Sequence, residues 1–337
     1  MANKTDSRKL EANVIQTIFS KVGVYLCIVV LIVIGSFVNP NFLTVSNFKN
    51  VIQASAMLGM VCAGMAFVVY SGHSLDMSVP IIIALAGVVC VDLLPFGIPI
   101  AVIGGLLSAL VVGFVNGFVV GKFKANPMIW TLGMKFVIDG LIRWLYHNTQ
   151  IYPDVVTEEA GCPEIGIAFM NLSRIRILNV NIMIYVMIVL LIVAQIVLTR
   201  TTFGRQLKII GAGRDVAKFS GINVTRNIVI SYMLCALTSG IMGVFLASMT
   251  RVGAFYNGSG YDFQAITAIV IGGMSLAGGR GNLFGVLGGV ITVKLLSNVM
   301  TFFGIGTYVQ DVITGIVFII IVYWNTRNLR KQGKDNV

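Results

Sequence analysis

Charged side chains are scarce in this sequence. Only 11% of the 337 residues are Asp, Glu, Lys or Arg, whereas 57% are hydrophobic, and the mean hydropathy is +0.91. A water-soluble domain of this size needs about a quarter of its residues charged to cover its surface. The deficit leaves no room for a large soluble domain and indicates a chain that lies mostly inside a membrane.

Residues that carry chemistry are also few. His73 and His147 are the only histidines, and they stand far apart without a Cys or carboxylate neighbour at ligand spacing. Four of the five cysteines lie inside apolar runs and Cys162 stands alone, which is not a disulfide framework. No nucleophile–histidine–acid arrangement is visible. We therefore predict no metal site, no catalytic residue and no cofactor, in a protein that is not an enzyme.

The sequence also lacks a phosphate-binding loop. Such a loop needs two glycines around four residues, followed by Lys and then Ser or Thr. The nearest approach, Gly121-Lys122-Phe123, has the wrong leading position and the wrong residue after the lysine. If the chain moves a solute, the energy must come from an ATP-hydrolysing partner subunit or from an ion gradient.

Apolar runs long enough to cross a hydrocarbon layer about 30 Å thick follow one another along the chain. They predict an all-α polytopic membrane protein. The run containing Gly272 and Gly273 is short and glycine-broken, which favours a discontinuous helix that packs on protein. The first run has no small-residue cleavage site after it and is interpreted as a retained span. The ten predicted spans are residues 22–38, 50–70, 77–94, 98–119, 127–146, 180–199, 226–249, 263–278, 283–302 and 308–324.

The basic residues predict the orientation of these spans. With the N-terminus in the cytoplasm, seventeen of the 24 Lys and Arg residues fall on the cytoplasmic side and five fall outside. An even number of spans then places both termini in the cytoplasm. The predicted organisation is a cytoplasmic segment 1–21, a transmembrane domain 22–324 and a cytoplasmic tail 325–337. The net charge of +11 is thus a topology signal, and we expect no nucleic-acid partner.

Two polar segments are long enough to carry function. The predicted outer loop, 147–179, holds a cluster of acidic residues, and the predicted inner loop, 200–225, is basic. Within the inner loop, Gly213 and Gly221 flank a short stretch that predicts an amphipathic helix with Gly221 as its stop. The residues alone leave two roles open for this helix: it lies on lipid headgroups, or it docks into a groove on a partner.

Charged residues inside spans are costly and therefore candidates for function. Lys135, Asp139 and Arg143 recur every four residues and share one face of the span 127–146. They form either an ion-paired ladder that stabilises the helix or a polar face that lines a solute path. Lys294 and Asn298 form a similar pair in a later span and leave the same two readings open.

The aspartate just before the span 77–94 has a simpler expected role. Asp76 stands where the helix is predicted to begin, and short acidic side chains accept hydrogen bonds from the first backbone N–H groups of a helix. We therefore predict that Asp76 caps this helix.

Four stretches are similar to motifs of one family. These are Phe203-Gly204-Arg205 followed by GAGRDVAKFSGINV, the block AITAIVIGGMSLAGGRGNLFGVLGG at 265–289, the element at 126–134 and the element at 71–79. Their order and content resemble the membrane permease subunits of bacterial ABC sugar importers of the ribose, xylose, arabinose and galactoside class, which are distantly related to branched-chain amino acid permeases. The chain departs from the usual pattern at His73-Ser74, where Gly-Ile is common, and at Arg214, where Asn is common.

The resemblance implies the permease fold and a set of partners. Two permease copies, or this permease and a sister chain, would surround a central path in the bacterial inner membrane. A cytoplasmic ABC ATPase, with tandem ATPase domains, would bind the inner loop, and a periplasmic binding protein would deliver a small sugar or sugar-like solute. The implied ATPase-coupling residues are Gly204, Arg205, Gly213, Arg214, Asp215, Ala217, Lys218 and Gly221.

The residues that line the solute path are predicted from the charges in the spans. Lys135, Asp139, Lys294 and Asn298 are the candidates. The alternative function is an ion-coupled secondary transporter, in which an isolated carboxylate within the membrane often carries the coupling ion. Two cations flank Asp139, and this argues against that alternative.

Overall fold

The chain is a polytopic α-helical membrane protein. The computed structural model describes residues 24–72 and 75–331; the predicted N-terminal segment 1–21, His73 and residues 332–337 of the predicted tail lie outside this part. Among the described residues, five helices are long and apolar enough to cross a membrane. They are α2 (Val45–Tyr70), α4 (Ile98–Lys122), α8 (Ile182–Arg200), α11 (Val224–Thr250) and α13 (Leu283–Phe302).

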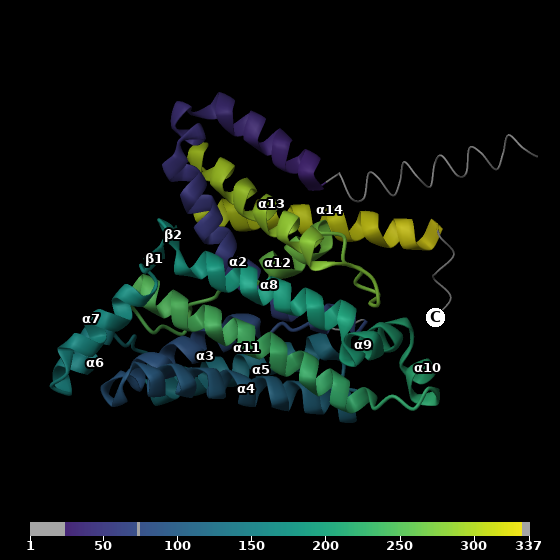
Figure 1. Cartoon of the computed structure of the whole chain (residues 1–337), viewed down its shortest axis with the longest axis horizontal. Coiled ribbons are helices and arrows are strands. Elements are labelled where there is room, and N and C mark those ends of the chain that lie inside the picture. Colours follow the sequence, from purple (N-terminus) through teal and green to yellow (C-terminus); the bar gives the residue numbers. More distant parts are fainter. Residues whose placement is uncertain (1–23, 73–74, 332–337) are drawn as a thin grey trace, which may run out of the picture.

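Further apolar helices accompany these five (Figure 1). A helix over Val24–Val38 precedes the short η1 (Pro40–Leu43), and η2 (Leu94–Phe96) follows α3. α5 (Pro127–Leu145) carries the predicted charged face, and α14 (Thr307–Lys331) ends the described chain. Their positions agree with the predicted spans to within a few residues, apart from the C-terminal end of α14.

Two helices are too short to cross the hydrocarbon layer. α3 (Val79–Asp92) has 14 residues and α12 (Tyr261–Ile271) has 11, so they measure about 21 and 16 Å along their axes. The predicted span 263–278 is therefore wrong over its second half. Residues 272–282 form a loop because Gly273, Gly278 and Gly279 adopt positive φ angles that end the helix.

α2 and α11 form the centre of the fold. α11 packs against α2, α3 and α4. Gly113 and Gly117 of α4 make this approach close, because a Cβ atom on either glycine would lie 2.5–2.6 Å from atoms of α11. The tight packing makes α2, α3, α4 and α11 one block, against which the remaining helices lie.

Short elements gather at the two ends of the bundle (Figure 1). One end, called here the hairpin end, carries α6 (Pro153–Glu159), α7 (Pro163–Leu172) and the antiparallel strands β1 (Arg176–Ile177) and β2 (Val180–Asn181). The other end, called here the α10 end, carries α9 (Thr202–Ala212), α10 (Arg214–Phe219) and the C-terminal end of α14. The predicted loops 147–179 and 200–225 thus contain structure at opposite ends.

The short amphipathic helix predicted in the segment 200–225 is confirmed. α10 begins after Gly213 and ends before Gly221, whose φ of +73° lies in the left-handed region that terminates helices. α9 was not predicted from the sequence. Two features of the sequence indicate this helix. Thr201 is a good N-cap residue, and its hydroxyl accepts a hydrogen bond from the N–H of Gly204. The apolar residues Phe203, Leu207 and Ile210 recur at helical spacing.

Candidate functional site

The N-terminal ends of α3 and α12 lie close together within the bundle. The segment 251–260 leaves α11 at the hairpin end and follows α3: Gly253 lies beside Val88, and Gly258 lies beside Pro80. Gly72, which follows α2 at the α10 end, contacts Gly211 of α9, and residues 75–78 lead directly into α3. Two loops from opposite ends therefore lead into two short helices that begin near each other.

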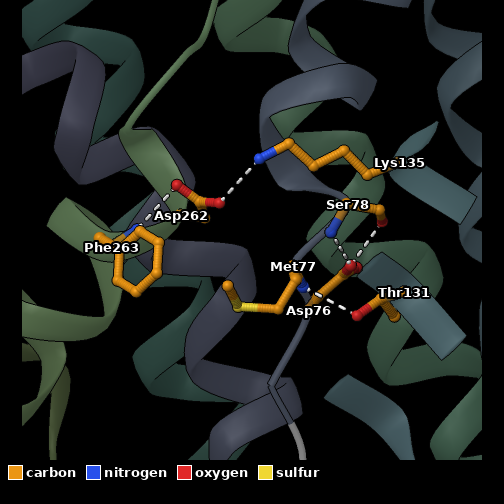
Figure 2. A network of polar contacts seen from close by, with 7 residues as sticks. All are labelled: Asp76, Met77, Ser78, Thr131, Lys135, Asp262 and Phe263. Carbon is orange, nitrogen blue, oxygen red and sulfur yellow. Dashed lines mark hydrogen bonds and ion pairs between the residues drawn. The ribbon is translucent and has the colours of Figure 1, made fainter. Parts of the chain in front are cut away.

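A network of short polar side chains fixes the start of α3. Asp76 is fully buried, and its Oδ1 accepts hydrogen bonds from the N–H and the hydroxyl of Ser78 (Figure 2). The Asn116 amide of α4 donates to the Ser78 hydroxyl over 2.8 Å, and the Trp130 indole of α5 donates to Asn116 over 3.0 Å. The N–H of Met77 donates to the hydroxyl of α5 residue Thr131 over 2.9 Å.

This geometry corrects the predicted role of Asp76. The N-cap residue of α3 is Ser78, which makes no side-chain capping bond, and Asp76 bonds the N–H of Ser78 two residues later. Such an Asx turn orders the loop before the helix instead of capping its first turn. Asp76 therefore holds the loop in place, and α3 is held by its links to α4 and α5.

An ion pair holds the start of α12. Lys135 of α5 lies 3.3 Å from Oδ2 of Asp262, and the exposed fractions of the two side chains are 33% and 2% (Figure 2). The other oxygen of Asp262 accepts from the N–H of Phe263.

The rest of the charged face of α5 pairs within the helix. Arg143 donates to Asp139 over 2.8 Å, as the ladder reading predicts for an i, i+4 pair. That reading is wrong for Lys135, which pairs with α12 and not with Asp139. The Arg143 guanidinium also lies 3.8 Å from the centre of the Phe255 ring, a cation–π contact between α5 and the segment 251–260.

These groups border a cavity of about 170 Å³. Its walls are the charged face of α5, the first turn of α3 and the segment 255–259. Lys135 and Asp139, two of the four predicted path residues, lie in these walls. The lining residues are Pro80, Ile81, Lys135, Phe136, Asp139, Arg143, Phe255, Tyr256, Asn257 and Ser259.

The structure places the other two predicted path residues elsewhere. Lys294 of α13 donates to Gln264 over 2.6 Å, and its ammonium lies 4.8 Å from the centre of the Tyr261 ring, so it contacts the first turn of α12. Asn298 exchanges hydrogen bonds of 2.8 and 3.0 Å with Asn47 of α2. Neither residue lines the cavity, and the two do not act as one i, i+4 pair.

The predicted coupling residues all lie in α9, in α10 or beside them. Gly204 is buried where α9 turns against the end of α8, and Arg205 donates to the Arg200 carbonyl. Gly213 and Gly221 bound α10, whose Ala217 is buried. The remaining predicted residues, Arg214, Asp215 and Lys218, lie along α10, with an exposed pair of 3.9 Å between Asp215 and Lys218.

Two apolar side chains of α10 point away from the protein. Val216 is 59% exposed and Phe219 is 93% exposed. A phenyl ring that is almost fully exposed gains nothing from the fold of this chain. It is a feature of a helix that contacts something else.

Three backbone segments meet beside α9 at glycines. A Cβ atom on Gly211 would lie 2.5 Å from the nitrogen of Gly279 and 2.6 Å from the carbonyl oxygen of Tyr70. Gly72 and Gly278 are equally close to each other, and the N–H of Gly279 donates to the Tyr70 carbonyl over 2.9 Å. This glycine junction joins α9 to the C-terminal end of α2 and to the loop that follows α12.

Sequence reasoning missed several residues of the site. Asp262 was left outside the charged spans because the predicted span begins at residue 263. Asn116 and Trp130 lie in spans as single polar groups with no spacing signal, and Asn257 lies in a connection. The glycines of the junction, in contrast, can be recognised in the sequence, because Gly211-Ala212-Gly213 and Gly278-Gly279 stand out as small residues between apolar helices.

Comparison with known sequences identifies the family. The family described as branched-chain amino acid transport system / permease component matches residues 47–322. This match covers α2 to α14 and hence every element of the site. No solved structure matches the chain.

Individual relatives align over nearly the whole chain. The ribose import permease protein RbsC of Bacillus subtilis is 33% identical over 90% of this chain and 92% of its own length. The L-arabinose transport system permease protein AraH of Escherichia coli is 31% identical over 91% of each chain. The L-arabinose ABC transporter permease protein AraH of Azospirillum brasilense is 28% identical over 94% of this chain. The resemblance seen in the sequence is confirmed, and the chain belongs to the family of branched-chain amino acid transport system permease components, beside ribose and arabinose permeases.

Proposed function

We propose that this chain is the membrane-spanning permease subunit of an ATP-binding cassette importer that carries a small sugar or sugar-like solute across the bacterial inner membrane. The observation that carries the proposal is the similarity to ribose and arabinose permeases over about 90% of each chain. The alternative, an ion-coupled secondary transporter, has one supporting feature in the two short helices α3 and α12. The pairing of Asp262 with Lys135 argues against it, because a coupling carboxylate must be free to take up an ion.

The ATPase subunit, with tandem ATPase domains, is proposed to bind α10. The nearly fully exposed Phe219 and the half-exposed Val216 supply an apolar contact, and Arg214, Asp215 and Lys218 supply charges around it. Gly213 and Gly221 end the helix sharply on both sides, so α10 forms a compact unit. A unit of this kind transmits a domain movement as a rigid body.

The glycine junction is the proposed route from α10 to the solute path. A movement of α9 presses on backbone at both Tyr70 and Gly279, with no flexible side chain between the segments to absorb it. Tyr70 ends α2, which precedes α3, and Gly279 lies in the loop after α12, whose preceding segment 255–259 lines the cavity. Closure of the ATPase domains would thus reposition the cavity walls.

The proposed topology has ten spans with both termini in the cytoplasm. The α10 end is then cytoplasmic, and the hairpin end with α6 and α7 faces the periplasm and its solute-binding protein. A second copy of this chain or a sister permease completes the path within the bilayer. Lys135 and Asp139 are proposed to line the path, and Lys294 and Asn298 to belong to its supporting wall.

The test is reconstitution of the permease with its ATPase and binding protein in proteoliposomes. Uptake of D-ribose or L-arabinose is expected to require ATP and to persist when ionophores remove all ion gradients. Uptake that runs on an ion gradient without the ATPase would overturn the proposal.

Substitutions in α10 test the coupling assignment separately. Phe219→Ala and Asp215→Lys change exposed side chains, so the permease should insert and fold normally but fail to stimulate the ATPase. A matched control is Phe303→Ala, which removes an exposed phenyl ring outside α9 and α10 and should leave stimulation intact. Normal uptake in both α10 variants would contradict the coupling assignment.

A further inference from the structure

The cavity beside α5 is small and partly polar. Its volume of about 170 Å³ is below the range of about 300–1,000 Å³ for pockets that hold drug-sized molecules, so its occupant is one small solute. The side walls come from α5 and the segment 255–259, and the first turn of α3 closes one side. The proposed function requires a path for solute, but it does not say what chemistry this cavity accepts.

The charges around the cavity cancel in pairs. Lys135 is paired with Asp262, and Arg143 is paired with Asp139. An anionic or cationic solute would have to break one of these pairs to gain a partner of its own. The walls therefore favour a solute without net charge.

The walls still offer hydrogen bonds in both directions. Oδ1 of Asp139 has no hydrogen-bond partner among the described residues, and neither do the hydroxyls of Tyr256 and Ser259. Asn257 is held with its amide donating to the Val252 carbonyl over 2.9 Å, which leaves its side-chain oxygen as an acceptor. Acceptors and hydroxyls around one small space suit a ligand that carries several hydroxyl groups, since each hydroxyl both donates and accepts.

Aromatic rings supply an apolar surface in the same space. Tyr256 is 47% exposed and packs edge-on against Phe255 with ring centres 5.3 Å apart, while Arg143 lies 3.8 Å from the centre of the Phe255 ring. A sugar ring has apolar C–H faces that pack on such rings while its hydroxyls reach the polar groups. A branched-chain amino acid would instead need unpaired groups for its ammonium and carboxylate and an apolar slot for its side chain.

We propose that this cavity is a direct contact site of the permease for a neutral polyhydroxylated ring, with Asp139, Tyr256, Asn257 and Ser259 as its contacts. The inference rests on the proposed function and deepens it: it separates sugars from branched-chain amino acids, the two solute classes suggested by the family and by its relatives. Lys135 acts here by holding Asp262 and keeping the walls neutral.

The test is protection of an introduced thiol in the reconstituted transporter. Cys27 and Cys162, the cysteines that are not buried, are first changed by Cys27→Ser and Cys162→Ser. Ser259→Cys then places a thiol in the cavity, and Tyr308→Cys, 90% exposed on α14, is the matched control. The rate of labelling by a methanethiosulfonate reagent is measured with D-ribose, L-arabinose or L-leucine present.

At a sugar concentration about ten times its Kd, labelling of Ser259→Cys should slow about tenfold by mass action. L-leucine should have no effect, and the control thiol should react at one rate throughout. Equal protection by L-leucine, or no protection by either sugar, would overturn the inference. Sugar uptake by the parent in the same vesicles tests the proposed function separately. ATP-driven uptake without protection would contradict the cavity assignment but leave the proposed function intact.

A second variant tests the neutral walls. Asp139→Asn keeps the shape of the side chain but leaves Arg143 without its anion. In this background D-ribose 5-phosphate should protect Ser259→Cys, whereas in the parent it should not. Protection by the sugar phosphate in both backgrounds, or in neither, would contradict the assignment of the paired charges.

Discussion

The starts of α3 and α12 each carry a buried aspartate, but different interactions hold the two helices in place. Each short helix begins at a buried aspartate, Asp76 or Asp262, with exposed fractions of 0% and 1%. Asp76 bonds its own loop, and short neutral side chains of α4 and α5 complete the network. Asp262 is held from outside by the long side chain of Lys135.

The difference indicates which helix is free to move. A network of short side chains loses its hydrogen bonds after a shift of about half an ångström, because these bonds need distances of about 2.7–3.2 Å. An ion pair on a flexible lysine keeps much of its energy over several ångströms. We therefore expect α3 to be a fixed wall of the cavity and α12 to be tethered but mobile.

The largest expected effect follows from Lys135→Met. This change keeps the unbranched apolar part of the side chain but leaves the Asp262 carboxylate, whose side chain is 2% exposed, without a counter-charge. Loss of one partner of a buried pair costs about 3–5 kcal/mol. This loss of stability is measured by thermal unfolding of the purified permease and its variant in detergent.

The reverse substitution sharpens this prediction. Asp262→Asn removes the anion and leaves Lys135, which is 33% exposed and can turn toward water, so the cost should be smaller. The double variant should recover most of the loss of Lys135→Met. Equal losses in the two single variants, or additive losses in the double variant, would show that the pair does not hold α12.

Asn116→Leu should have the next largest effect, at the start of α3. Leu has the same branched arrangement of heavy atoms as Asn, although it is larger, but it cannot donate to Ser78 or accept from Trp130. Each stranded polar group costs about 1–3 kcal/mol, and the half-buried Trp130 indole contributes less than the buried Ser78 hydroxyl. The expected total is about 2–3 kcal/mol in the same unfolding assay. A loss below that of Thr131→Val would contradict a closed network.

Much of the fold can be predicted from the sequence, but the ends of the short helices cannot, as α12 shows. Long apolar runs predict α2, α4 and α11 because each spans the bilayer by itself. The end of α12 was misplaced because apolar residues continue to Ala277, while the left-handed glycines that end the helix are recognisable only from their backbone angles. Contacts between distant helices set those angles.

The site was predicted less well than the fold for a related reason. Spacing places Lys135, Asp139 and Arg143 on one face, and the structure agrees. The partner of Lys135 lies 127 residues away, so no local pattern connects the two. The same holds for Asn116 and Ser78, whose pairing depends on how α3 and α4 pack.

Thr131→Val is expected to have a smaller effect. Val keeps the shape of Thr but offers no acceptor to the N–H of Met77, a buried residue. One stranded backbone N–H costs about 1–3 kcal/mol, and this one lies at the edge of the network, so we expect the lower half of that range. Thr131→Ser keeps the hydroxyl and is the matched control, with a loss well below that of Thr131→Val.

Lys294→Met should have the smallest effect, although it repeats the largest one on the opposite side of α12. Lys294 bonds the neutral Gln264 amide and lies over the Tyr261 ring, so its removal strands no carboxylate. The variant loses one hydrogen bond but no longer has to bury an ammonium group, and these two effects oppose each other. The net change in the free energy of unfolding should stay within about 1 kcal/mol. If the buried Asp262 carboxylate decides the stability of α12, the free energies of unfolding lost in Lys135→Met and Lys294→Met should differ by about 2–4 kcal/mol. A loss at Lys294 as large as that at Lys135 would mean that both lysines hold α12 by packing. The distinction between the ion pair of α12 and the hydrogen-bond network of α3 would then fail.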